Sequence, residues 1–152
     1  MTEFIIKSDT IEAADVIALL DLHLAEAYQD ACSAAFGREA LSAPNVTFFT
    51  ARDKSQNLAG FAALKIWNTD LGEIKSVRTH SDFLRRGVST ALMKHLTTFA
   101  RSNGLRQLSL ETHPTPAYAA ARALYERLDF NYCDAFGDYE NSPKSVFMTK
   151  TL

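Results

Sequence analysis

The sequence predicts an α/β fold with a mixed, mostly antiparallel central sheet of six to seven strands flanked by about four helices. Three observations support this. Strand-like segments in the first half are joined by short turns, an amphipathic helix pattern follows a strand at Gly87, and a C-terminal hairpin follows a further strand and helix. With 152 residues, 47% of them hydrophobic, the chain can bury a substantial core. We therefore expect one domain over residues 1–152.

The first half is predicted to form an antiparallel meander. Asp9 and Glu12 can form a capping box at the start of the first helix. The turn-forming sequence DKSQN joins two strand-like runs, which is typical of a hairpin. In chain order we expect a strand over 4–7, a helix after it, a shorter helical or irregular piece over 31–44, and strands over 46–52, 58–67 and 72–79.

The second half alternates helix and strand. Apolar residues recur at spacings of three and four after Gly87, which predicts a helix, and Gly104 is placed to cap its end. Thr115 and Pro116 then favour the start of another helix, because proline is tolerated in a first turn. We expect the strands of this half over 105–112, 131–136 and 145–150, with the last two paired as a hairpin.

The junction before the central helix is chemically suited to a phosphate. Arg85 and Arg86 stand immediately before Gly87, where the strand gives way to the helix. The first N–H groups of a helix have no partner within it, and the helix dipole favours an anion there. Arginine adds forked donors that match phosphate oxygens. An ordinary connection with two solvated arginines is the alternative at this point.

Composition excludes several classes of function. The net charge is −2, so no basic field points to nucleic acid. No apolar run approaches the roughly 20 residues that cross a bilayer, and the N-terminus does not resemble a signal peptide. We therefore expect a cytoplasmic protein without a membrane partner. Cys32 and Cys133 lack CxxC spacing and the histidines form no ligand motif, so no metal site is expected.

Two segments resemble the GNAT superfamily of acyl-CoA-dependent N-acyltransferases. The run from Leu84 to Ser89 is similar to its coenzyme loop, R/Q-x-x-G-x-G/A, with Leu84 at the first position and Ser89 at the last. The run from Ala121 to Phe130 resembles A-x-x-L-Y-x-x-L-G-F, with Asp129 in place of glycine. Tyr118 stands where many members have asparagine.

The resemblance implies a binding site for acetyl-CoA. The strand with Glu73 and the strand that begins at Leu105 should run parallel and splay apart, with the coenzyme between them. Backbone groups of the first strand would pair with pantetheine, and the loop and helix start would hold the pyrophosphate. The coenzyme-binding residues implied are Val77, Arg78, Thr79, Arg85, Arg86, Gly87, Val88, Ser89, Thr90 and Tyr118.

The resemblance also assigns catalytic roles. Tyr125 aligns with the tyrosine that protonates the departing thiolate, and the alternative is a buried ring that only packs. Glu73 is the candidate base, acting through water, and the alternative is an exposed carboxylate at a strand edge. His80 or His113 could replace it as the base. Cys133 has no activating neighbour in the sequence, which favours a buried apolar role over acyl transfer.

The function implied is transfer of an acetyl group from acetyl-CoA to a primary amine, by direct attack in a ternary complex. Acidic residues in turns and at strand ends could attract a cationic acceptor: Asp70, Glu73, Asp134, Asp138 and Glu140. A non-catalytic acyl-CoA sensor is the first alternative. A nucleotide-binding protein is disfavoured because the chain has neither G-x-x-x-x-G-K-[ST] nor G-x-G-x-x-G. Superfamily members commonly dimerise, which leaves a homodimer open.

Overall fold

The computed structural model describes residues 3–29 and 37–152, and over these ranges the chain forms a sheet of seven strands. The spatial order is β1-β2-β3-β4-β5-β7-β6. All neighbours are antiparallel except β4 and β5, as the sequence predicts for a mixed sheet. The strands are β1 (Ile5–Ser8), β2 (Val46–Arg52), β3 (Leu58–Ile66), β4 (Leu71–Thr79), β5 (Gln107–Thr112), β6 (Asn131–Cys133) and β7 (Val146–Thr151).

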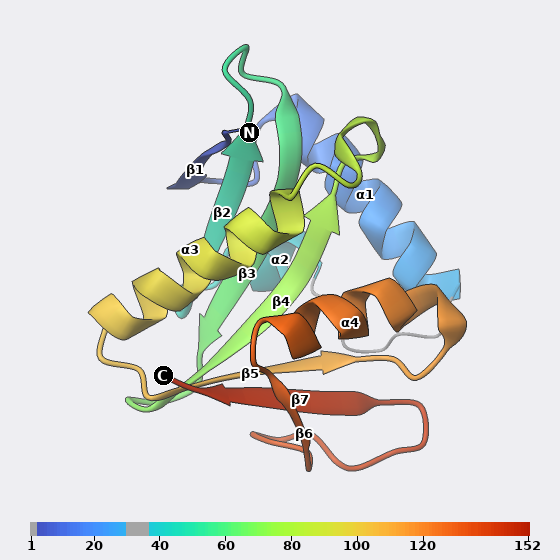
Figure 1. Cartoon of the computed structure of the whole chain (residues 1–152). Helices are drawn as coiled ribbons and strands as arrows, with labels where there is room; N and C mark the ends of the chain where they lie inside the picture. Colours follow the sequence, from blue (N-terminus) through green and yellow to red (C-terminus); the bar gives the residue numbers. More distant parts are fainter. Residues whose placement is uncertain (1–2, 30–36) are drawn as a thin grey trace.

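Helices cover both faces of the sheet (Figure 1). Helices α3 and α4 cross one face, whereas α1 and α2 lie behind the other. The bounds are α1 (Ala14–Gln29), α2 (Arg38–Leu41), α3 (Val88–Ser102) and α4 (Ala119–Arg127), with single 3-10 turns η1 (Ser81–Phe83) and η2 (Pro116–Tyr118). None of the helices within the described ranges is both long and apolar enough to cross a membrane.

The alternation of side chains along the strands divides the core into two layers. Phe49, Ile74 and Leu110 face α3 and α4, together with Leu92 and Leu96 of α3 itself. The layer on the opposite face packs under α1 and is made of Val16, Leu19, Leu20, Leu41, Phe48, Leu58, Phe61 and Ala63. Consecutive side chains of a strand therefore point to opposite faces of the sheet, and this alternation determines the face on which each polar side chain of β4 and β5 lies.

Strands β4 and β5 pair for only part of their length. The parallel register runs from Leu71 opposite Gln107 to Ile74 opposite Leu110. Both strands continue beyond this point, and Figure 1 shows them fanning apart toward the C-terminal half of α1. Within β4 the register with β3 shifts near Ser76, whose φ of 57° lies in the left-handed region. The bulge turns β4 away from β5, which opens the sheet as predicted.

Two local expectations are corrected. The capping box of Asp9 and Glu12 does not form, because α1 begins at Ala14. One oxygen of Asp9 instead accepts from the Thr50 hydroxyl group at 3.0 Å, and the other accepts from the next backbone N–H group. In the predicted 31–44 piece, α2 accounts for Arg38–Leu41, whereas 31–36, including Cys32, lies outside the described residues.

The predicted helix ends and C-terminal hairpin agree with the structure. Gly104, after α3, has a φ of 79°, and Asp129, after α4, has a φ of 69°. Aspartate tolerates this left-handed conformation better than most side chains, so the motif keeps its turn without glycine. Strands β6 and β7 pair antiparallel, with Cys133 opposite Phe147.

Candidate functional site

A cavity of about 150 Å³ lies where β4 and β5 separate. Its walls come from five parts of the chain: both diverging strands, α1, η2 and α4. Val77, Tyr118 and Tyr125, three of the residues implied by the sequence, line it. The remaining lining side chains are His23, Ala27, Ile74, Lys75, Ser76, Leu110, Glu111, Thr112, His113 and Ala121. The splayed strands therefore enclose a hollow lined by both apolar and polar residues.

Tyr125 is held in the cavity wall by α4. Its side chain is 8% exposed and its ring meets Phe130 edge-on, with ring centroids 6.1 Å apart. Burial raises the pKa of the phenol to about 12. Within the described part of the chain no hydrogen bond engages its hydroxyl group. The phenol thus keeps its proton near neutral pH and is available as a donor.

The turn before α3 contains two residues in the left-handed conformation. Gly87 has a φ of 81° and Arg85 a φ of 62°. The first backbone bond of α3 runs from the Ala91 N–H group to the Gly87 carbonyl group at 3.0 Å. By helix geometry the N–H groups of residues 88–90 have no partner within the helix. Such a turn is an anion-binding concavity.

The side chains around this turn have separate partners. The hydroxyl groups of Thr79 and Ser89 lie 2.7 Å apart, which ties the end of β4 to the start of α3. The guanidinium group of Arg86 lies 4.7 Å from the centre of the Phe83 ring. Arg78 pairs with Glu26 of α1, and its buried Nε atom has no partner within the described ranges. The hydroxyl group of Ser89, one of the implied coenzyme-binding residues, is therefore already engaged by Thr79.

Glu73 is fully buried, which excludes the alternative of an exposed carboxylate at a strand edge. It lies on the α1 face of β4 and does not line the cavity. Trp67 Nε1 donates to one oxygen at 3.0 Å and the Tyr139 hydroxyl group donates to the other at 2.8 Å. Lys75 Nζ lies 3.3 Å from the second oxygen and donates to Tyr139 at 3.0 Å. Three groups therefore surround the carboxylate: the indole N–H group of Trp67, the hydroxyl group of Tyr139 and the ammonium group of Lys75.

The loop between β6 and β7 closes over Glu73. Gly137 in this loop has a φ of 58°, and a Cβ atom there would lie 2.8 Å from the Trp67 ring. Only glycine meets both conditions, since a side chain would be strained and would clash. The turn brings Tyr139 over Trp67, with ring centroids 6.1 Å apart. The sequence did not indicate this cover, because it joins residues more than 60 positions apart.

Of the carboxylates proposed for the acceptor, none lines the cavity. Asp70, Asp134, Asp138 and Glu140 belong to turns or loops outside its lining. The carboxylate that does line it is Glu111, which the sequence interpretation overlooked. Alternation along β5 was the available signal, because apolar Leu108 and Leu110 point to α3 and α4, leaving Glu111 on the face of Glu73.

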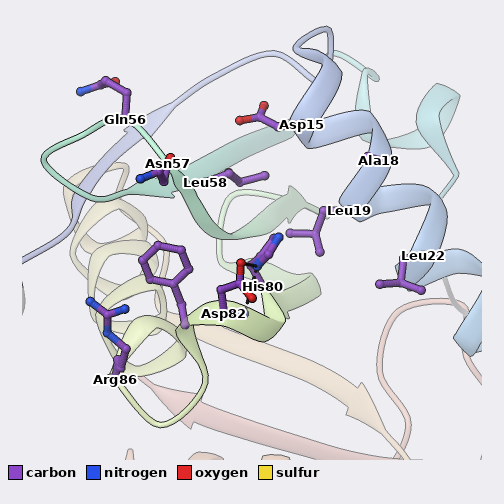
Figure 2. A pocket seen from close by; sticks show the side chains of 11 residues that line it. Asp15, Ala18, Leu19, Leu22, Gln56, Asn57, Leu58, His80, Asp82 and Arg86 are labelled. Atoms are coloured by element: carbon purple, nitrogen blue, oxygen red, sulfur yellow. Dashed lines mark hydrogen bonds and ion pairs between the residues drawn. The ribbon is translucent and has the colours of Figure 1, made fainter.

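The two histidines considered as alternative bases lie in different hollows of the structure. His113 lines the cavity and stacks on Tyr118, with ring centroids 4.8 Å apart. His80 lies in a different hollow of about 640 Å³, which α1, the β2–β3 turn and the segment after β4 enclose. Figure 2 shows Leu19 reaching from α1 toward His80 across this hollow, with Arg86 at its border. Of the two, only His113 is near Tyr125.

Comparison with known proteins gives a consistent result. The Acetyltransferase (GNAT) family model matches residues 13–130. YsnE of Bacillus subtilis, described as an uncharacterized N-acetyltransferase, is 40% identical over 150 residues, covering 97% of this chain and 99% of that protein. A solved structure from Klebsiella pneumoniae is 26% identical with a TM-score of 0.78, covering 98% and 97% of the two chains. A GNAT acetyltransferase of Elizabethkingia anophelis, solved with acetyl-CoA bound, shares the fold at 16% identity, with a TM-score of 0.71 and 98% of each chain covered.

Proposed function

Because this chain belongs to the Acetyltransferase (GNAT) family, we propose that it transfers an acetyl group from acetyl-CoA to a primary amine within a ternary complex. The observation that carries the proposal is the position of Tyr125, a protonated phenol in the wall of the cavity between the diverging strands. The acetyl-CoA bound to the Elizabethkingia protein supports the choice of acyl donor.

The coenzyme is proposed to follow β4 and end at α3. Beyond Ile74, β4 keeps β3 as a neighbour but no longer pairs with β5 within the described ranges. Backbone groups of Val77, Arg78 and Thr79 on that side can pair with the amides of pantetheine. The residues proposed for the pyrophosphate are Arg85, Arg86, Gly87, Val88, Ser89 and Thr90, through the open N–H groups, the arginine charge and the Thr90 hydroxyl group.

Tyr125 is proposed as the general acid. When the C–S bond of the thioester breaks, the thiolate of coenzyme A needs a proton. A phenol with a pKa of about 12 is fully protonated at pH 7, so it is ready to donate at that moment. Tyr118, which lines the cavity and stacks on His113, is proposed to contact pantetheine.

Direct transfer is favoured over an acyl-enzyme on Cys133. Burial and the adjacent Asp134 raise the pKa of this thiol, which makes it a poor nucleophile. For the base, Glu73 stays a prediction from the sequence. Since it does not line the cavity, it would have to reach the amine through an intervening water or side chain.

The test combines binding and turnover. Acetyl-CoA is titrated by calorimetry into the wild type, Tyr125→Phe and the exposed control Tyr132→Phe, and thiol release is followed with a panel of primary amines. We expect equal affinity in all three proteins and roughly 10²-fold slower turnover in Tyr125→Phe alone. Binding without thiol release for any amine would instead support the acyl-CoA sensor. Absence of binding would overturn both functions.

A further inference from the structure

We propose that Glu111 is the carboxylate that binds the ammonium group of the acceptor and takes its proton. This inference rests on the proposed transfer reaction and specifies its acceptor side. Ile74 and Leu110 form the last pair, so the next residue on each strand, Lys75 on β4 and Glu111 on β5, stands where the sheet opens. Both line the cavity that Tyr125 also lines.

The two oxygens of Glu111 have different surroundings. Oε2 accepts a hydrogen bond of 2.6 Å from the hydroxyl group of Ser145, just before β7. Oε1 is buried and has no hydrogen-bond partner within the described ranges. A buried carboxylate oxygen without a donor is costly, whereas an ammonium N–H group would satisfy it. Ser145 therefore orients the carboxylate and leaves one oxygen for a ligand.

Charge in the cavity also favours a cation beside Glu111. The ammonium group of Lys75 is matched by the carboxylate of Glu73 at 3.3 Å and by the hydroxyl group of Tyr139. Burial and the charge of Arg78 lower the pKa of His23 to about 4, so this imidazole in the cavity lining is neutral at pH 7. Glu111 itself forms no ion pair with any residue of the described part. The charge in the cavity lining that has no counter-ion among the described residues is thus the negative charge of Glu111.

A comparison of the two glutamates separates their roles. Glu73 has Trp67, Tyr139 and Lys75 around its oxygens and lies outside the cavity lining. Glu111 has a single donor and lies in the lining. Glu73 thus holds Lys75 and Tyr139 in position, and Glu111 contacts the amine.

The proposed step balances as follows. Glu111 accepts one proton from the ammonium group, and the nitrogen lone pair then attacks the carbonyl carbon of the thioester. The C–S bond breaks, and its electron pair leaves on sulfur as thiolate. Tyr125 gives its proton to the thiolate and regains the second proton lost by the nitrogen as the amide forms. Glu111 finally releases its proton to water. An alkyl ammonium of pKa near 10.4 makes the first transfer necessary at neutral pH.

The experiment compares two nucleophiles in the same protein. Thiol release from acetyl-CoA is measured with primary amines (butylamine, spermidine and glycinamide) and with hydroxylamine, which is largely neutral at pH 7 and needs no base. The proteins are the wild type, Glu111→Gln and Glu39→Gln, an exposed carboxylate on α2 as control. We expect Glu111→Gln to lower kcat/KM for the amine by roughly 10²-fold and to leave the hydroxylamine rate within about threefold of wild type.

Each other outcome has one meaning. Equal loss with both nucleophiles would assign Glu111 a structural role and overturn the inference. Wild-type rates with the amine in Glu111→Gln would overturn it as well. In both cases the proposed transfer reaction would stand. If the wild type binds acetyl-CoA but acetylates no amine, the transfer reaction itself fails, and the inference fails with it.

Discussion

The buried pair of Glu73 and Lys75 is expected to determine stability more than proton transfer. Their side chains are 0% and 6% exposed, and the charge of each is balanced by the opposite charge of the other. We consider three variants: Glu73→Gln, Lys75→Met and the double substitution. Glu73→Gln leaves a buried ammonium group without its counter-ion, and Lys75→Met leaves the carboxylate with only Trp67 and Tyr139 as donors.

The magnitude follows from this burial. Removing one partner of a buried ion pair costs about 3–5 kcal/mol, whereas replacing both by neutral groups of similar volume is close to neutral. For a domain of this size each kcal/mol lowers Tm by about 2–4 °C, so each single variant should melt roughly 6–20 °C below wild type. The double variant should regain most of that loss.

The assay is urea unfolding at pH 7, followed by circular dichroism, with thermal melts in parallel. A coupling free energy near zero, with single costs that simply add, would refute the reasoning. The same series bears on the base. If Glu73→Gln keeps wild-type stability but loses turnover with an amine and not with hydroxylamine, Glu73 is the base and the role of Glu111 must be given up.

Three further predictions concern backbone and charge. Gly87 and Gly104, at opposite ends of α3, have φ angles of 81° and 79°, so Gly87→Ala and its control Gly104→Ala should each lower the free energy of unfolding by about 1 kcal/mol. Only Gly87→Ala should also weaken acetyl-CoA binding, measured by calorimetry. Equal affinities of the two variants would contradict the anion site. Gly137→Ala should be less stable than Gly104→Ala, because its Cβ atom also meets the Trp67 ring, and equal denaturation midpoints would contradict this. The folded-state pKa of His23 is lowered from 6.5 to about 4, so the unfolded chain binds this proton first and stability falls as the pH drops through that window. The loss should reach roughly 2–3 kcal/mol at pH 4.5 and largely vanish in His23→Gln, and an unchanged pH profile of that variant would exclude the effect.

Local signals predicted most of the fold. The turn after Arg52, the glycine before α3 and the glycine after it each depend on neighbouring residues, and the structure has each of these elements where the pattern indicated. The start of α1 was wrong because Asp9 is used by Thr50, a partner 41 positions away. Capping patterns compete with tertiary hydrogen bonds, and a sequence window shows only the former.

The site was predictable where a motif marks it. Gly87 and Tyr125 stand in recognisable runs; Gly87 precedes α3 in the left-handed conformation, and Tyr125 lies in the cavity wall. Glu73 was placed on the correct strand, but its burial depends on Tyr139 in a loop that no local pattern joins to it. Glu111 belongs to no recognisable motif. Two structural facts single it out: the pairing of β4 with β5 ends just before it, and one of its carboxylate oxygens has no hydrogen-bond partner within the described residues.

Trp67 gives this loop an optical reporter. It is the only tryptophan of the chain, its indole donates to Glu73, its ring meets Tyr139 edge-on, and Lys65 Nζ lies 3.9 Å from the ring centre. With tryptophan excited selectively, fluorescence therefore reports on one place, the cover over the buried ion pair. Emission recorded during stopped-flow mixing with acetyl-CoA or an amine would time any movement of that cover without a label.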